Sequence, residues 1–255
     1  MSWKVATSSV TGSSHANRGE PGQDNCRAGS IRIADDEFFI GLVADGAGST
    51  TNGGRGAEIA CETMYASIID CLRQDGDISH ITDEIVRQWI TLSRDAIAAE
   101  AEGNGRKVRD YACTFLGAIA GNGHALFFQI GDGAIVVREG EEFQTIFWPE
   151  QGEYANTTFF ITDEAYLERL NVLHAGSTPE EVALFTDGLQ NLALSFAQKK
   201  AHAGFFQPLF LALKNDPASG FTDFAGQLRR FLLRDDVSAR SDDDKTLVLA
   251  TRNQG

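Results

Sequence analysis

The sequence predicts an α+β fold in which two antiparallel β-sheets pack face to face between outer helices, a four-layer α/β/β/α sandwich. Short strands follow one another between residues 112 and 147, and their connections are brief and rich in glycine. Strands joined so closely must be antiparallel, because a parallel pair needs a crossover of about a dozen residues. Helical patterns form one early and one late group around these strands. This order favours helices on both outer faces over a doubly wound parallel sheet.

Composition limits the classes of function. The chain has 255 residues, of which 42% are apolar, and only five prolines, so we expect one domain spanning 1–255. A net charge of -14 argues against a nucleic-acid partner and against docking on an anionic membrane. The N-terminus lacks the apolar core of a signal peptide and no apolar run is long enough to span a membrane, so a cytoplasmic location is expected. The cysteines lack zinc-site spacing, which favours reduced thiols.

The first half of the chain supplies one group of strands and one pair of helices. A polar, glycine-bearing segment separates the first strand from a hairpin that turns at residues 35–36. The helices show apolar residues at three- and four-residue spacing, and acids begin the second one, as the helix dipole favours. The expected strands are Lys4–Val10, Ser30–Ala34 and Glu37–Ala44, and the expected helices are Asn52–Gln74 and Thr82–Gly103.

The second half supplies a longer series of strands, then the late group of helices and one last strand. The expected strands are Ala112–Ala120, Ala125–Ile130, Ala134–Arg138, Glu142–Phe147, Phe159–Ile161, Val172–Ala175 and Val182–Thr186, with a last strand at Thr246–Ala250. Helical patterns before that last strand cover Leu189–Ala201, Phe206–Lys214 and Thr222–Leu233.

Three acidic residues stand where buried strands end or begin. Asp45 ends the apolar run FFIGLVADGAGS, Asp187 ends VALFTDG, and Asp243 precedes TLVLA. Carboxylates at strand ends can converge from distant parts of a chain, and hard divalent cations prefer such oxygen ligands. Gly46 could add its backbone carbonyl because it has no side chain to obstruct it. Taken singly, each acid is equally well explained as a turn or loop residue.

Asp132 is excluded from this set. It lies in Gly131-Asp132-Gly133 between two expected strands, and a hairpin turn accounts for it fully.

With these residues placed, the chain resembles the protein phosphatase 2C family, the metal-dependent protein serine/threonine phosphatases. The matching motifs occur in the family's order and span nearly the whole chain. They are Arg18 with Gln23-Asp24, VADGAG at 43–48, CTF followed by GDG, TDG at 186–188 and DDKT at 243–246. GEPGQD at 19–24 and EYANTTFF at 153–160 are similar to the atypical prokaryotic branch.

The resemblance implies a phosphatase with a binuclear magnesium or manganese centre at one edge of two antiparallel sheets. Asp45 would bridge both ions, the Gly46 carbonyl would bind one of them, and Asp187 and Asp243 the other. Arg18 would hold the substrate phosphate, as a bidentate guanidinium can. A water activated by the cations would attack phosphorus without a phosphoenzyme. The implied substrate is a phosphorylated protein, and members of this branch often work opposite a serine/threonine kinase.

Departures from the family pattern add candidate residues. Gln23 stands where the family has glutamate, so Asp24 could replace that metal ligand. Ala47 stands where many members have a histidine that is the candidate general acid. His15 could supply this acid, and the alternative is a loop histidine bonded to backbone. Asp110 is a candidate for a third ion or an ordinary surface acid.

Gln23 and Ala47 also keep a rival function open. A catalytically impaired pseudophosphatase would bind a phosphoprotein or a regulatory partner without turnover. The retained Asp45, Asp187 and Asp243 argue against it, because such a module would have no physical need for the metal-binding acids. A hydrolase of small phosphate esters is a third alternative.

Overall fold

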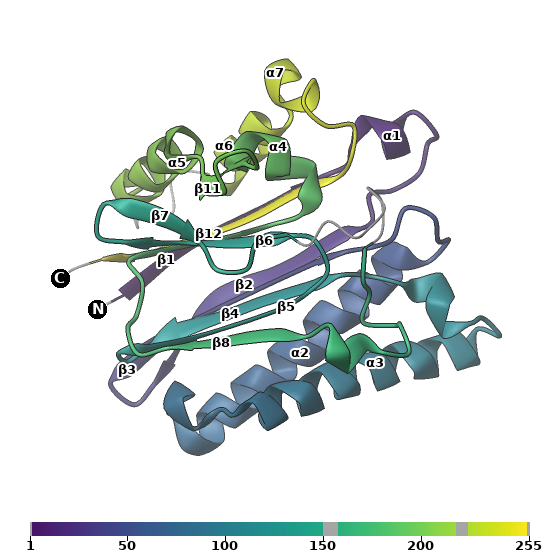
Figure 1. The fold of residues 1–255 in the computed structure, drawn as a ribbon, viewed down its shortest axis with the longest axis horizontal. Helices are drawn as coiled ribbons and strands as arrows, with labels where there is room; N and C mark the ends of the chain where they lie inside the picture. The colour runs from purple at the N-terminus through teal and green to yellow at the C-terminus, as the bar shows by residue number, and fades with distance from the viewer. Residues whose placement is uncertain (1, 150–157, 218–223, 254–255) are drawn as a thin grey trace.

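The computed structural model describes residues 2–149, 158–217 and 224–253, and it contains two five-stranded antiparallel sheets (Figure 1). The first sheet has the order β1-β12-β9-β6-β7, formed by Ser2–Val10, Lys245–Asn253, Glu181–Phe185, Ala134–Glu139 and Glu142–Thr145. The second has the order β2-β3-β4-β5-β8, formed by Asp24–Ile33, Asp36–Asp45, Phe115–Gly121, His124–Ile130 and Asn171–Ala175. The short strands β10 (Leu194–Ser195) and β11 (Lys200–Ala201) form a separate hairpin.

Helices cover the outer face of each sheet, so the predicted four-layer α+β fold is confirmed (Figure 1). The long helices α2 (Gly53–Asp75) and α3 (Asp83–Gly103) lie on the second sheet, and α5 (Ala203–Asn215) and α6 (Phe224–Leu232) lie on the first. The short helices are α1 (Ser13–Ala16), α4 (Gln190–Ala193) and α7 (Asp235–Ser238), with 3-10 turns at η1 (Ile78–His80), η2 (Val108–Tyr111), η3 (Tyr166–Glu168) and η4 (Asp187–Leu189). In the described part of the chain, no helix combines the length and the apolar character needed to cross a bilayer.

The alternation of side chains along β3 shows why the layers form. Phe38, Ile40 and Leu42 point to the helix side and join the core beneath α2 and α3. Phe39 and Val43 point the other way, into the core between the two sheets. Every one of these side chains is fully buried, because a strand covered on both faces needs apolar residues at successive positions. A third core lies between the first sheet and α5 and α6.

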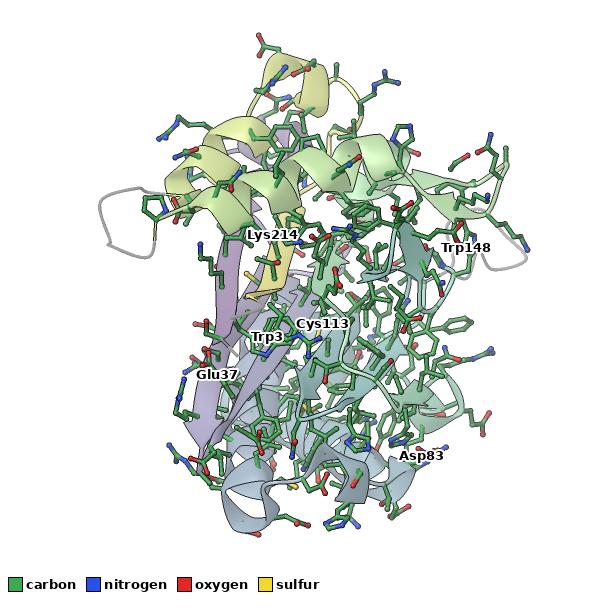
Figure 2. The ribbon with its side chains drawn as sticks, turned by 90° about the vertical axis from the view of Figure 1, so that its left-hand side faces the viewer. Trp3, Glu37, Asp83, Cys113, Trp148 and Lys214 are labelled. Atoms are coloured by element: carbon green, nitrogen blue, oxygen red, sulfur yellow. The ribbon has the colours of Figure 1, made fainter. Side chains whose placement is uncertain are left out.

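The first and last strands of the chain pair with each other. Ser2 faces Asn253 and Val10 faces Lys245 across the β1–β12 ladder. Figure 1 shows both termini at one end of the sandwich and α1 at the other. Trp3 lies in the interior between the sheets (Figure 2), where its ring centroid is 5.4 Å from that of Phe39. The first and the last of the described strands therefore lie side by side in the first sheet.

The structure corrects three sequence predictions. β5 and β6 do not form a hairpin, because β5 pairs within the second sheet and β6 within the first. The expected helix Leu189–Ala201 ends at Ala193 and continues into the β10–β11 hairpin. No strand forms at Phe159–Ile161. Part of EYANTTFF and the expected start of the helix at Thr222 lie outside the described residues.

Candidate metal centre

Four acidic residues reach the same end of the sandwich, opposite the chain termini (Figure 1). Asp24 begins β2 and Asp45 ends β3, and the two are directly opposite in the β2–β3 ladder. Asp187 follows β9 by one residue, and Asp243 precedes β12 by one residue. Antiparallel pairing brings the start of one strand beside the end of the next, so acids from four distant segments meet at one edge.

A cavity of about 320 Å³, here called the acid cavity, lies at this edge. Asp45, Asp187 and Asp243, three of the candidate ligands, line it, whereas the fourth acid, Asp24, does not. The remaining lining residues are Ala47, Gly48, Ser49, Thr114, Asp132, Thr158 and Phe160.

Asp132 also lines the acid cavity, and the hairpin turn that was expected to account for it does not form. The reason is the path of the chain: residues 131–133 cross from one sheet to the other instead of turning within one. Gly131 takes a φ of 105°, which favours glycine there. The Asp132 carboxylate accepts a hydrogen bond from Thr158 Oγ1, and its carbonyl accepts one from Gln190.

The backbone around Asp45 is held from two sides. Its N–H donates to Thr114 Oγ1 at 3.1 Å, and its carbonyl accepts from the Thr114 N–H at 2.8 Å. The next residue, Gly46, donates to the Gln23 carbonyl at 3.2 Å. A Cβ on Gly46 would lie 2.3 Å from the Gly53 carbonyl carbon, so only glycine allows α2 to approach this closely. These contacts fix the direction in which β3 presents its terminal carboxylate.

The carboxylates of the centre are difficult to ionise. Burial raises the pKa of Asp24 to about 7, with hydrogen bonds from Thr246 and Thr186 acting against the increase and the charges of Asp244 and Asp187 adding to it. Burial, followed by the charge of Asp24, holds the pKa of Asp45 well above its usual range. Burial, with Asp132 and Asp243 nearby, raises the pKa of Asp187 to about 7. Burial, and next to it the negative charge of the neighbouring acids, therefore oppose the ionised form of each acid.

The donor set fits hard divalent cations. Buried Asp24 Oδ1 and Asp187 Oδ1 have no hydrogen-bond partner in the described part of the chain. Buried carboxylate oxygens are ordinarily paired or bound to metal, because an isolated charge is costly to bury. An all-oxygen set of carboxylates suits Mg²⁺ or Mn²⁺. Asp24, Asp45, Asp187 and Asp243, with the Gly46 carbonyl, are the residues that would hold such ions.

Arg18 lies beside the acid cavity and does not line it. It borders a neighbouring cavity of about 610 Å³ that shares Gly48 and Ser49 with the acid cavity. Its side chain is about half exposed, and Nε lies 2.6 Å from a Glu20 carboxylate oxygen. Gln23 borders the same neighbouring cavity, and its amide nitrogen donates to the Thr50 carbonyl at 3.2 Å. Asp110 instead accepts the Lys107 N–H at the start of η2.

His15 is buried away from the acid cavity. It is 3% exposed, and its Nδ1 lies 3.1 Å from Asp244 Oδ1. It is not among the residues that line the acid cavity, so the structure does not support His15 as the general acid. A histidine in a polar, glycine-bearing segment gave no sequence signal of this burial.

Comparison with known proteins agrees with this geometry. The family model described as protein phosphatase 2C matches residues 11–232. The chain is 38% identical over 251 residues to serine/threonine-protein phosphatase 3 of Escherichia coli (strain K12), covering 98% of each chain.

Solved structures share the fold. Serine/threonine phosphatase Stp1 from Staphylococcus aureus superimposes with a TM-score of 0.64 at 15% identity, covering 99% of this chain and 96% of that one. The catalytic domain of serine threonine protein phosphatase PstP in complex with two manganese ions gives a TM-score of 0.61 at 15% identity, with 98% of both chains covered. The family match confirms the resemblance seen in the sequence: the chain belongs to the protein phosphatase 2C family of phosphatases.

Proposed function

We propose that this protein is a metal-dependent serine/threonine phosphatase that hydrolyses phosphoserine and phosphothreonine on proteins at the acid cavity. The observation that carries the proposal is the convergence of the Asp45, Asp187 and Asp243 carboxylates on one cavity, where a buried Asp187 oxygen has no hydrogen-bond partner among the described residues. The name of the E. coli relative, with which the chain shares 38% identity, supports the same reaction. The match to PstP in complex with two manganese ions supports two ions in the centre.

Each acid has a proposed position in the centre. Asp45, which ends β3 and lines the acid cavity, would contact both ions. Asp24, opposite Asp45, and the Gly46 carbonyl would complete the ligands of one ion, and Asp187 and Asp243 those of the other. Bound divalent cations supply Lewis acidity that generates a water-derived nucleophile near neutral pH and neutralises phosphate charge.

The remaining residues orient the substrate. Gly48 and Ser49 form the wall between the acid cavity and the cavity that Arg18 borders. A phosphoryl group in the acid cavity would therefore leave the flanking residues of a peptide beside Arg18. The guanidinium can exchange its exposed Glu20 partner for phosphate, because exposed ion pairs contribute little, about 0 to 1 kcal/mol.

Hydrolysis of a phosphothreonine peptide with Mn²⁺, Mg²⁺ or a chelator tests this function. We expect metal-dependent turnover that Asp187→Asn abolishes and that the matched control Asp70→Asn, an exposed acid on α2, retains. A folded wild-type protein that binds the phosphopeptide without turnover would instead be a pseudophosphatase. Faster turnover of small phosphate esters than of phosphopeptides would contradict the proposed substrate class.

A further inference from the structure

Asp244 is a buried carboxylate that belongs to the framework of the centre and does not line its cavity. It directly follows Asp243 and is 2% exposed. Its Oδ1 accepts the N–H of Gly12 and its Oδ2 accepts the N–H of Gln23, each at 2.6 Å. Those two residues lie at either end of the connection between β1 and β2. The Asp244 side chain therefore links the start of β12 to both ends of the β1–β2 connection, which lies more than 200 residues earlier in the chain.

Close backbone packing surrounds this carboxylate. A Cβ added to Gly12 would lie 2.2 Å from the Asp243 carbonyl carbon, and one on Gly188 would lie 1.9 Å from the Asp244 carbonyl oxygen. His15 closes a further side with Nδ1 3.1 Å from Oδ1, although neither ring nitrogen has regular hydrogen-bond geometry. The Ser14 N–H also donates to the Asp242 carbonyl at 2.8 Å, so α1 is attached to the same acidic loop.

A cation site is the alternative interpretation of the cluster formed by His15, Asp243 and Asp244. Ligand atoms of His15, Asp243 and Asp244 lie within 4.8 Å of one another. However, both Asp244 oxygens already accept short backbone hydrogen bonds, and neither His15 nor Asp244 borders the acid cavity or the neighbouring cavity. The contacts of Asp244 are those of a structural support that holds the backbone.

We propose that Asp244, with His15 beside it, is a positioning residue for the metal centre. Asp244 holds Gln23, whose carbonyl accepts the Gly46 N–H at 3.2 Å, and the next residue, Asp24, faces Asp45. The same residue sets the path of Asp243 into β12. Asp244 therefore fixes the spacing between the acids of β2 and β3 and the acid that precedes β12. This inference rests on the proposed function for the identity of the metal ligands.

The test is Mn²⁺ binding, measured by titration calorimetry, together with turnover as a function of Mn²⁺ concentration. Asp244→Ala removes both acceptors, and Asp244→Asn restores one. Asp242→Ala is the matched control, because Asp242 is an exposed acid of the same loop. We expect Asp244→Ala to weaken Mn²⁺ binding by about tenfold or more, Asp244→Asn to lie between it and wild type, and Asp242→Ala to stay within about twofold.

Turnover at saturating Mn²⁺ should fall less than the Mn²⁺ affinity, because Asp244 acts through the ligands and not on the substrate. Unchanged Mn²⁺ affinity in Asp244→Ala, or an equal loss in Asp242→Ala, would overturn the proposal. If Asp244→Ala does not fold, as judged by circular dichroism of the metal-free protein, Asp244→Asn takes its place under the same criteria.

Variants of His15 distinguish a supporting role for this residue from a role as metal ligand or as proton donor. His15→Asn keeps an N–H near the position of Nδ1, whereas His15→Gln moves it along the side chain. We expect His15→Asn to bind Mn²⁺ more tightly than His15→Gln, with unchanged Mn²⁺ stoichiometry and an unchanged pH profile of turnover. Loss of one bound ion would make His15 a ligand, and an altered pH profile would make it a proton donor, and either result would overturn the proposal.

The experiments can refute the phosphatase function and the positioning role of Asp244 independently of each other. Wild-type protein that shows no turnover while its Mn²⁺ affinity still depends on Asp244 would refute the phosphatase and leave the positioning role intact. Wild-type turnover with identical Mn²⁺ affinity in all variants would refute the positioning role alone.

Discussion

Asp24 and Asp45 face each other as directly opposed residues at the last position of the β2–β3 ladder. Like charges directly opposite each other in a sheet destabilise it. The pair persists beside Asp187, whose pKa is also raised to about 7 by burial and by neighbouring acids. The fold therefore keeps acids together whose negative charges oppose one another, and a bound divalent cation would offset that repulsion.

The stability of the metal-free protein should fall as pH rises. The folded-state pKa values of Asp24 and Asp187 are about 7, against an ordinary value of 3.8. Between these values the folded state binds more protons than the unfolded state, so the free energy of unfolding decreases with rising pH. Urea unfolding with a chelator should show a loss of at least about 1 kcal/mol between pH 5 and pH 8.

Two comparisons check the origin of that loss. Asp24→Asn should flatten the dependence on pH, because it removes one of the titrating groups. Saturating Mn²⁺ should reverse the dependence, because metal binds the deprotonated acids and stabilises the folded state. A slope that is the same in Asp24→Asn and wild type would contradict the assignment.

Asp45→Asn should stabilise the metal-free protein while removing its activity. Asn has the shape of Asp without the buried charge, so unfolding of the metal-free variant at pH 8 should cost about 1 kcal/mol more than that of wild type. Mn²⁺-dependent kcat/KM should fall by about 100-fold or more. A metal-free variant that is less stable than wild type would show that Asp45 is not under electrostatic strain.

Asp132→Asn should weaken metal binding through the loss of charge. Asn can still accept the hydrogen bond from Thr158, so the loop should keep its position. We expect Mn²⁺ affinity to fall by about tenfold, because the negative charge near Asp187 and Asp243 is reduced. Thr158→Val removes the hydrogen bond and keeps the charge, so its Mn²⁺ affinity should stay within about threefold of wild type. Equal losses in both variants would assign the effect to loop position.

Gly56→Ala should destabilise the fold. A Cβ at Gly56 would lie 2.0 Å from the Tyr111 carbonyl oxygen, so α2 would have to move away from the segment that supports Gly46 and Ala47. Overpacking of this kind costs about 1 to 3 kcal/mol. The matched variant Gly103→Ala, on α3 with open space around its Cβ, should be neutral or stabilising in the same chemical unfolding experiment.

The sequence predicted the layers and three of the cavity acids because both depend on local patterns. The apolar run of β3 is long enough to identify a buried strand, and Asp45 ends it. The Asp-Gly dipeptide itself is a weaker signal. It follows a strand at Asp45, Asp132 and Asp187, but it also occurs at Asp75, at the end of helix α2, where Gly76 caps the helix in the left-handed conformation. The position of an acid at the end of a buried strand therefore predicted the cavity acids better than the Asp-Gly dipeptide did.

The errors concern long-range contacts that no local pattern encodes. Nothing near Gly131 or Gly133 says whether the next strand joins the same sheet or the opposite one, and that choice decided whether Asp132 reaches the cavity. His15 was expected in a polar loop, and its burial depends on Asp244, which is 229 residues later in the chain. The helix expected over Leu189–Ala201 follows helical spacing at its start, but tertiary pairing converts its end into the β10–β11 hairpin.

The pairing of β1 with β12 has a consequence for biosynthesis. β12 follows every other strand of the two sheets in the chain, yet it lies between β1 and β9, and Asp243 lies two residues before its first residue. A ribosome-bound chain that lacks β12 has two unpaired strand edges and an incomplete set of acids. Contacts of such high sequence separation form slowly, so the nascent chain must wait for β12 before the first sheet can close. The acids beside β9 and β12 therefore come together only in chains that have been translated through β12.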